Sequence, residues 1–567
     1  MLMHQLAADA ERILGELPPP MYDCKRVRWL VSLDVNGCLQ GIVPLGMDEK
    51  GKHRGLLMEV PFVKRTSGIR PILLADTPAY TYGPPSSDKR AEAKHEAYLG
   101  LMRECAAATG NAEMSAVLNY LCSVGEEEGL PVSAGTGDIV TFEVAGARPI
   151  EDSAVKKFWR TKAGDSAGDS PTSRSCIICG SEAPIPEMPP VPVKGVPGSQ
   201  SEMSLTGVNF VTGESYGLVR AENASICHIC GERAGKTLNF LLRDSAHHVR
   251  VGPVAYVFWT KEDSPFDIAT LMSAPREGDV RALLESAKAG RKSAEVQHDG
   301  FFAAALSANG GRVVVRKWIS TTVPQVAANL ARWFRLTGIV RPWGEDSAPL
   351  STKGLAASIF LKPEDVTARV STALMSAALD GGDPPFDLLR AALARCRVST
   401  QRGGRVTHPQ AALIKAVLVR RCNEQEEYMT TLECQEESPA YLCGRLFAVI
   451  ESVQYAALGR VNATVADKFF SAASTAPATV FGKLLSDAQP HLAKLRKTRE
   501  GAHVALQTRL EEIATRIGPS FPRILSIEEQ GRFMLGYYHQ RATDRADSRV
   551  ARERKNGASD SEKEESK

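Results

Sequence analysis

The sequence predicts an α+β fold: an N-terminal mixed α/β region with a zinc-clipped insertion, followed by a C-terminal all-α helix bundle. Short apolar runs alternate with turns over residues 22–83, which is typical of β-strands. Two Cys-x-x-Cys-Gly sequences lie between 176 and 231, at a spacing suited to a structural zinc ion. After the Gly-Gly-Asp-Pro-Pro sequence at 381–385, apolar residues recur at helical spacing.

The composition is that of an ordinary globular protein. Of the 567 residues, 24% are charged and 43% are hydrophobic, and a chain of this length is expected to form about two to four domains. The formal net charge is only +3, so binding to nucleic acid would depend on a local basic patch. The N-terminus lacks the apolar segment of a signal peptide, and no apolar run approaches the roughly 20 residues that span a bilayer. We therefore expect a cytoplasmic protein with no membrane segment.

Residues 1–160 are expected to form the mixed α/β region. A hairpin is predicted where Asn36-Gly37 separates two apolar runs, because this pair favours the tight turn between antiparallel strands. A helix is predicted from Ala91 to Ala108, and a further strand from Asp138 to Phe142. The region therefore combines strands and helices.

Residues 161–235 form a linker-rich segment around the first cysteine pair. Each Cys-x-x-Cys-Gly turn directs two thiolates toward one ion, and two such turns complete a tetrahedral site. A redox pair or coincidence would explain one pair alone, but the duplication favours zinc. Because four thiolates leave no open coordination position, the zinc is expected to be structural and the segment between the pairs to be a loop clipped at its base. The candidate ligands are Cys176, Cys179, Cys227 and Cys230.

The sequence CHICGERAGKT at 227–237 also resembles a phosphate-binding loop, but its spacing excludes that function. The motif Gly-x-x-x-x-Gly-Lys-Ser/Thr has four residues between its glycines, whereas three separate Gly231 from Gly235. A cysteine pair also stands where the motif requires a β-strand. Residues 236–242 are instead predicted to form a plain helix.

Residues 236–385 are predicted to form a sheet with helices on one side. Apolar runs from 250 and at 310–320 indicate buried strands, and an amphipathic helix follows through Phe334. His298-Asp299 stands alone, without a partner His or Asp at metal-ligand spacing. No other catalytic motif is found, so no residue is given a catalytic role.

Residues 386–545 are predicted to form the helix bundle. Ser438-Pro439 begins one helix, and Ser526 with Glu529 forms a capping box at the start of another. Their apolar stripes are ordinary core signatures and indicate a bundle without indicating a function. Residues 546–567 are expected to form a disordered charged tail.

Several long blocks carry a resemblance to a known family. In the N-terminal region they read LPPPMYDCKRVRWLVSLDVNG and VPFVKRTSGIRPILLADTPAYTYG, and further along FVTGESYGLVRAENAS and GGRVVVRKWIS. In the bundle they read YLCGRLFAVIESVQYAALG, NATVADKFFSAASTAPATVF, HLAKLRK and EEQGRFMLGYYHQR. In this order, from about residue 10 to 541, they resemble the large subunit of type I-C CRISPR effector complexes (Cascade), the Csd family. The second cysteine pair lies outside these blocks, so the zinc prediction depends on spacing alone.

The resemblance implies a non-catalytic subunit of an RNA-guided surveillance complex. Such a subunit lies at the foot of a filament on the CRISPR guide RNA, with backbone subunits and a guide-end-binding subunit as neighbours. It senses the protospacer-adjacent motif in target double-stranded DNA, helps strand separation and recruits a helicase-nuclease. Some relatives also produce a small subunit by translation from inside the gene, for which Met429 is a candidate start here, with a non-AUG start upstream of it as the alternative. The alternative is a zinc-containing nuclease, or another stand-alone nucleic-acid enzyme, that uses His298-Asp299.

Local basic patches are the candidate nucleic-acid sites. Segment 64–70 concentrates cations and hydroxyls around Gly68, and its predicted DNA-contacting residues are Lys64, Arg65, Thr66, Ser67 and Arg70. Weaker candidates for contact with nucleic-acid backbone are Arg316, Lys317, Lys494, Arg496, Lys497 and Arg499. For each patch the alternative is an ordinary solvated turn or helix face.

Overall fold

The computed structural model describes residues 1–15, 21–46, 54–63, 65, 68–84, 88–123, 134–166, 173–199, 203–208, 210–262, 267–290, 300–398 and 406–564, with the backbone alone at 164–166, 286–290 and 551–564. The chain divides into two compact units. The N-terminal unit comprises Met1–Lys194 and Glu202–Phe240, and the C-terminal unit comprises Gly195–Ser201 and Leu241–Lys567. Among the described helices, none is long and apolar enough to cross a bilayer.

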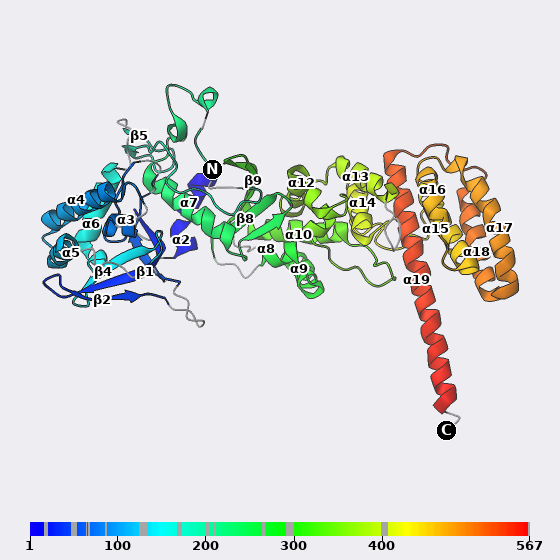
Figure 1. Cartoon of the computed structure of the whole chain (residues 1–567). Coiled ribbons are helices and arrows are strands. Elements are labelled where there is room, and N and C mark those ends of the chain that lie inside the picture. Colours follow the sequence, from blue (N-terminus) through cyan, green and yellow to red (C-terminus); the bar gives the residue numbers. More distant parts are fainter. Residues whose placement is uncertain are drawn as a thin grey trace. The chain divides into compact units, whose positions relative to one another are not determined.

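The N-terminal unit is built on a mixed four-stranded sheet around β1 (Tyr22–Leu33) (Figure 1). β2 (Leu39–Pro44) pairs antiparallel with the second half of β1. β3 (Leu56–Pro61) pairs antiparallel with its first half, and β4 (Ile139–Val144) pairs parallel with its second half. The predicted hairpin is confirmed, because Gly37 turns the chain between β1 and β2 at a φ of +89°.

Helices pack against this sheet around a core that includes Val31, Tyr98 and Phe142, all fully buried. The helices of the unit are α1 (Leu2–Ala8), α2 (Ala10–Leu14), α3 (Pro78–Thr81), α4 (Ala91–Thr109), α5 (Ala112–Ser123) and α6 (Ser153–Ser166). A small hairpin of β5 (Ser173–Ser175) and β6 (Glu182–Pro184) follows, and then α7 (His228–Arg243). The predicted helix at 91–108 corresponds to α4.

The C-terminal unit begins with an antiparallel meander of β7 (His248–Val251), β8 (Val254–Thr260), β9 (Gly300–Asn309) and β10 (Arg312–Thr322). Ala303, Ala305 and Ile319 on one face of this sheet share a core with Val326 and Leu330 of α10 (Val323–Thr337). The same core includes residues of four short helices: α8 (Ile268–Ser273), α9 (Glu277–Gly290), α11 (Thr352–Ala357) and α12 (Ala368–Leu379). The arrangement agrees with the predicted sheet with helices.

The remainder is the predicted helix bundle, centred on α15 (Pro439–Leu458), whose residues from Ala440 to Ile450 are all buried. Around it are α13 (Phe386–Val398), α14 (His408–Arg421), α16 (Val465–Ala473), α17 (Phe481–Thr498), α18 (Glu500–Ile517) and α19 (Ile527–Glu564). The α+β class, with its C-terminal all-α part, is therefore confirmed. So is the capping box that begins α19: the Ser526 hydroxyl accepts from the Glu529 N–H, and the Glu529 carboxylate accepts from the Ser526 N–H.

Two expectations differ from the structure. One hydrophobic core continues from Val249 of β7 through Trp333 of α10 to Phe533 of α19, so the break at 381–385 ends a helix without separating two cores. The predicted disordered tail at 546–567 is wrong for most of its length, because α19 continues as helix to Glu564. The segment contains no proline and is rich in Ala, Arg, Glu and Lys, which favour helix once a packed stem has nucleated it.

Candidate metal centre

The first cysteine pair is carried by the β5–β6 hairpin. Ser175 lies opposite Glu182 in this hairpin, and Cys176 and Cys179 occupy the turn between the strands. The N–H of Gly180 donates to the carbonyl of Cys176 at 2.8 Å, and Gly180 has a φ of +74°. This left-handed conformation favours glycine, so Gly180 allows the tight turn that follows the first pair.

The second pair lies at the N-terminal end of α7. Cys227 immediately precedes the helix and Cys230 lies in its first turn. The N–H of Gly231 donates to the carbonyl of Cys227 at 3.0 Å. Gly231 itself lies within the helix and, unlike Gly180, does not occupy a turn between strands. Its lack of a side chain allows close packing, because a Cβ there would lie 3.0 Å from the ring of Pro190.

The two pairs meet as one cluster of four sulfur atoms. The Sγ atoms of Cys176, Cys179, Cys227 and Cys230 all lie within 4.8 Å of one another. The Sγ atoms of Cys179 and Cys227 are 3.9 Å apart, and the N–H groups of Ile178 and Cys227 each donate to the Sγ of Cys176 at 3.4 Å. Within the described parts of the chain, this is the one group of His, Cys, Asp or Glu residues arranged to hold a metal ion.

Burial and hydrogen bonding act on these thiols in opposite directions. Hydrogen bonds from the backbone and side chain of Ser181 lower the pKa of Cys179 to about 6. Burial raises the pKa of Cys227 and of Cys230. Four thiolates this close repel one another strongly unless a cation neutralises them, and a coordinated metal keeps such thiols deprotonated. The donor set therefore fits a bound metal ion.

The geometry limits what such an ion could do. Four thiolates in a tetrahedral arrangement suit Zn²⁺ or an iron–sulfur centre. All four positions are filled by protein, so no position is left for a water molecule or a substrate, as in structural sites. Three of the cysteines are buried and only Cys179 is exposed. The cluster can therefore hold the β5–β6 hairpin against the start of α7, and its geometry supports a structural role and not a catalytic one.

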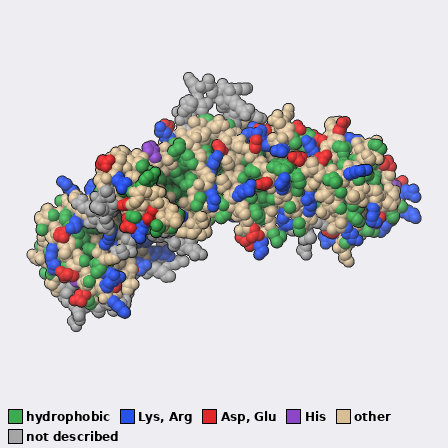
Figure 2. Space-filling view, turned by 90° about the horizontal axis from the view of Figure 1, so that it is seen from above, with side chains coloured by type: hydrophobic (Ala, Val, Ile, Leu, Met, Phe, Trp, Pro, Cys, Tyr) green, Lys and Arg blue, Asp and Glu red, His purple; other side chains and the backbone are tan. Residues whose placement is uncertain are grey.

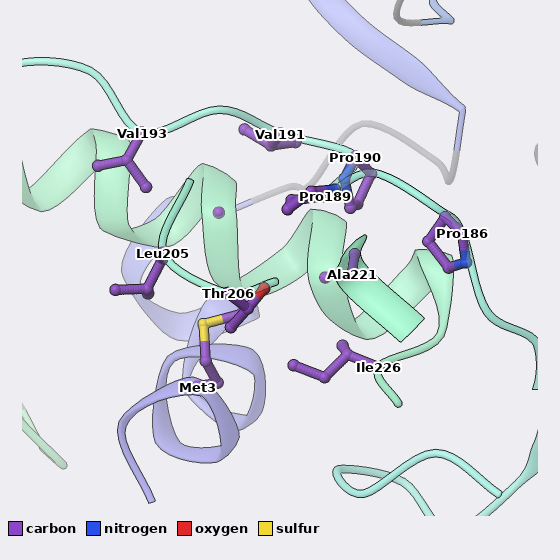
Figure 3. Close-up of a pocket in the computed structure, with 12 residues that line it drawn as sticks. Met3, Pro186, Pro189, Pro190, Val191, Val193, Leu205, Thr206, Ala221 and Ile226 are labelled. Carbon is purple, nitrogen blue, oxygen red and sulfur yellow. The ribbon is translucent and has the colours of Figure 1, made fainter. Parts of the chain in front are cut away.

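The same helix packs tightly against the proline-rich segment that follows β6. A Cβ on Gly235 would lie 2.7 Å from the Cβ of Val191, closer than two carbon atoms can approach. Figure 3 shows Pro189, Pro190 and Val191 along α7, beside a small apolar pocket that Met3 also lines. The Gly-x-x-x-Gly spacing that resembled a phosphate loop is thus explained by packing between a helix and an extended chain.

An ion pair on α7, between Glu232 and Lys236, fixes the start of β1. The Glu232 carboxylate lies 2.7 Å from the ammonium of Lys236 and accepts a hydrogen bond from the Met21 N–H at 3.3 Å. The Lys236 ammonium also donates to the carbonyl of Tyr22 at 2.5 Å. One helix therefore connects the metal cluster to the central strand of the N-terminal sheet.

The predicted DNA-contacting loop is described in part. Lys64, Thr66 and Ser67 lie outside the described residues. The Arg65 guanidinium pairs with the buried carboxylate of Asp76, donates to the carbonyl of Arg70 at 2.8 Å and lies 4.1 Å from the centre of the Tyr80 ring. Arg65 therefore ties the two ends of the 65–70 segment together within the protein.

The weaker candidates fall into two groups. Arg316 donates to the buried Ser307 hydroxyl at 2.8 Å, and Lys317 pairs with Asp380 at 2.7 Å, so both make contacts within the C-terminal unit. The exposed cations near the end of α17 have no ion pair with any described residue; they are Lys494, Arg496, Lys497 and Arg499. Figure 2 shows Lys and Arg side chains mixed with Asp and Glu on the face that it draws, without one continuous basic stripe. His298 and Asp299 lie outside the described residues.

Sequence reasoning missed the partners of these residues. Asp76 lies 11 residues from Arg65, is buried, and accepts hydrogen bonds from the N–H groups of Ile72 and Thr77. The pairing of Glu232 with Lys236 could have been found in the sequence, because the two residues are four apart, the spacing of an ion pair on a helix. The Asp76 contact had no such local signal, because a tertiary turn brings the two residues together.

The model of a family described as CRISPR-associated protein (Cas_Csd1) matches residues 3–544. The search of curated proteins found no match.

Proposed function

The chain belongs to the Cas_Csd1 family of CRISPR-associated proteins, and from this premise we propose that it is the non-catalytic large subunit of an RNA-guided Cascade complex. In this role it senses the protospacer-adjacent motif in duplex DNA, helps strand separation and recruits the helicase-nuclease. The observation that carries the proposal is the family match over residues 3–544, which spans both structural units.

The charge of the chain supports this role. In RNA-guided recognition, base pairing with the guide carries the sequence information, and the protein reads only a short motif and holds backbone. Such a protein needs local cations and not a large net charge. The net charge of +3 and the mixed surface charges agree with that requirement.

We propose that the 64–70 segment contacts the DNA, with Lys64 and Arg70 as its cations. The guanidinium of Arg65 contacts Asp76, the Tyr80 ring and the Arg70 carbonyl. These contacts favour a role for Arg65 in holding the segment in place. The exposed cations of α17 are proposed to lie along the displaced DNA strand, a contact that single-stranded nucleic acid makes with basic grooves.

The metal in the four-cysteine cluster is proposed to be Zn²⁺ with a structural role. The position of the cluster supports a structural role. It adjoins α7, the helix whose Glu232 and Lys236 hold the start of β1. The proposed partners are the guide RNA, the target DNA, the backbone and guide-end-binding subunits, and a small subunit translated from the same gene.

The proposal is tested by reconstitution with the guide RNA and the neighbouring subunits. The complete complex should bind duplex DNA that carries the correct flanking motif more tightly than duplex with a scrambled motif, and the complex without this chain should lose that preference. The competing nuclease function is tested on the isolated chain with Mg²⁺ or Mn²⁺ and labelled DNA. Cleavage that His298→Ala abolishes would replace the proposed function with an enzymatic one.

A further inference from the structure

We propose that the arm between the two cysteine pairs, defined as residues 203–226, docks its apolar tip (Phe210–Val219) into a groove on a neighbouring protein subunit. Figure 1 draws this segment, between β6 and α7, as a loop that extends away from the packed elements of the N-terminal unit. The inference rests on the proposed membership of a multi-subunit complex and adds a contact surface that the family match does not assign.

The base of the arm is held at several points beside the metal cluster. The Ile177 N–H donates to the carbonyl of Ser225 at 3.0 Å, and the Ser225 hydroxyl donates to the carbonyl of Ser175 at 2.9 Å. Met203 pairs with Val193, and the Ala221 N–H donates to the carbonyl of Glu187 at 2.9 Å. The arm therefore leaves and rejoins the unit at a fixed place.

The tip is organised by its own hydrogen bonds. The Asn223 amide donates to the carbonyls of Leu218 at 2.9 Å and Arg220 at 3.2 Å, and its oxygen accepts from the Ser215 N–H at 3.1 Å. Ser215 and Leu218 also form an isolated bridge. The Asn223 side chain thus holds together the turn that carries the exposed apolar side chains.

Those side chains are exposed to a degree that the fold does not explain. Tyr216 is 99% exposed and Val211 is 81% exposed, with Phe210 at 52% and Val219 at 41%. Four exposed apolar residues thus fall within ten residues of chain, exposed apolar surface beyond the ordinary scatter marks interaction sites, and tyrosine is among the residues that dominate interface energies.

The backbone of the arm is also strained. Tyr216 has a φ of +57°, Arg220 of +47° and Ser225 of +42°, in the region that residues with a Cβ rarely adopt. Strained backbone persists where the surroundings determine it and is concentrated at functional sites. A fully exposed tyrosine on strained backbone adds no packing to this chain, so its role lies in contact with a partner.

The charges of the arm favour a protein partner over nucleic acid. Its charged residues are Glu214, Arg220 and Glu222, and Arg220 is paired with Glu187 outside the arm. Binding to a phosphate backbone draws most of its affinity from cations, and the one cation of the arm is already paired. The core of a protein interface, by contrast, is depleted in charge and enriched in aromatic residues.

The test compares three purified chains for binding to a complex of guide RNA and the other subunits, assembled without this chain. The arm variant is Val211→Ser with Tyr216→Ser. The control, Val35→Ser with Leu57→Ser, removes two exposed apolar side chains from the same unit, 70% and 60% exposed. We expect the arm variant to bind the complex at least about tenfold more weakly than wild type, as loss of interface anchors does, while the control binds as wild type. Equal melting temperatures and metal contents establish that both variants are folded.

Three results would overturn the inference. Wild-type assembly by the arm variant would show that the tip makes no subunit contact. Normal assembly with weakened duplex binding would assign the tip to DNA. A change only in self-association of the isolated chain, measured by sedimentation, would assign it to a second copy. If wild type itself fails to join the complex, the proposed function fails and the role of the arm with it.

Discussion

Gly444 of α15 and Gly536 of α19 mark the place where two helices cross with their backbones in contact. A Cβ on Gly444 would overlap the carbonyl oxygen of Phe533, and a Cβ on Gly536 would overlap the carbonyl oxygen of Tyr441. Around the crossing, the Tyr441 hydroxyl lies 2.9 Å from Nδ1 of His539, and Arg445 donates to Gln540 at 3.0 Å. The two glycines therefore set the distance at which these polar pairs meet.

Replacing Gly444 with Ala should destabilise the C-terminal unit by about 1–3 kcal/mol, the usual effect of overpacking a core. The matched controls are Gly482→Ala in α17 and Gly501→Ala in α18, where a Cβ would meet nothing within 4 Å. These should be neutral or stabilise by up to about 1 kcal/mol, because Ala favours helix over Gly. Urea unfolding followed by circular dichroism measures all three. If Gly444→Ala matches its controls, the helices do not cross at this distance.

Acid should destabilise the bundle through His539. Burial lowers the pKa of this imidazole from 6.5 to about 3, so the folded state prefers the neutral ring. The unfolded state binds the proton first, and the stability is therefore complete above pH 6.5 and lost as the pH falls from 6.5 toward 3. One such group gives a slope of at most about 1.4 kcal/mol per pH unit. The difference in unfolding free energy between wild type and His539→Gln should shrink over this window, and a constant difference would contradict the assignment.

Purified protein should contain about one zinc ion per chain. Removing it with a chelator, or replacing Cys227 with Ser, should lower the melting temperature of the N-terminal unit by roughly 5 °C or more. Cys38→Ser alters an exposed cysteine outside the cluster and should leave the metal content unchanged. Elemental analysis separates zinc from iron, and freshly reduced protein without either metal would contradict the site.

Arg65 should act on DNA binding through Asp76. If Arg65 braces the 65–70 segment, Arg65→Lys should bind duplex DNA as weakly as Arg65→Gln. Lysine lacks the planar guanidinium that reaches a carboxylate and a carbonyl together. Asp76→Asn should weaken duplex binding as Arg65→Gln does, and the double variant should be no worse than either, because the two changes break one contact. A phosphate contact predicts the reverse: lysine rescues, and Asp76→Asn leaves binding intact or improves it.

Lys64→Ala and Arg70→Ala should each reduce the salt dependence of duplex binding by about one unit of slope. Assembly on guide RNA should be unchanged, and Lys353→Ala in the other unit serves as a control for loss of one positive charge. Affinity and motif discrimination that stay constant at physiological salt would exclude the segment from the DNA interface.

The gene should yield a second product that starts near Met429. This product contains α15 and the helices α16 to α19, which share one hydrophobic core with it. In the full chain Met429 is 1% exposed at a φ of +60°, so an untagged Met429→Leu gene tests the start with a conservative side chain. Intact mass of the complex should show the short product with wild type and not with the variant. A complex of full-length chain alone that binds target fully would end this prediction.

Local patterns in the sequence were sufficient for local features. Asn36-Gly37 and the Ser526–Glu529 capping box each predicted a structure whose determinants lie within a few residues, and the repeated Cys-x-x-Cys-Gly sequence predicted that two distant segments meet at one metal site. The pairing of Arg65 with Asp76, the packing of Gly235 on Val191 and the continuous core across 381–385 could not be predicted that way. Each depends on which distant segment folds beside the residue, and a pattern along the chain carries no information on that neighbour.

The pairing of β1 has a consequence for synthesis on the ribosome. β2 and β3 follow β1 closely, but the second half of its other edge is completed by β4, which begins at Ile139. At about 5–20 residues per second, this edge stays unpaired for roughly 5–20 s after Leu33 has been made, and the anchor from Lys236 to Tyr22 arrives later still. Nascent chains that end before Val144 therefore expose an open strand edge, which a chaperone has reason to cover.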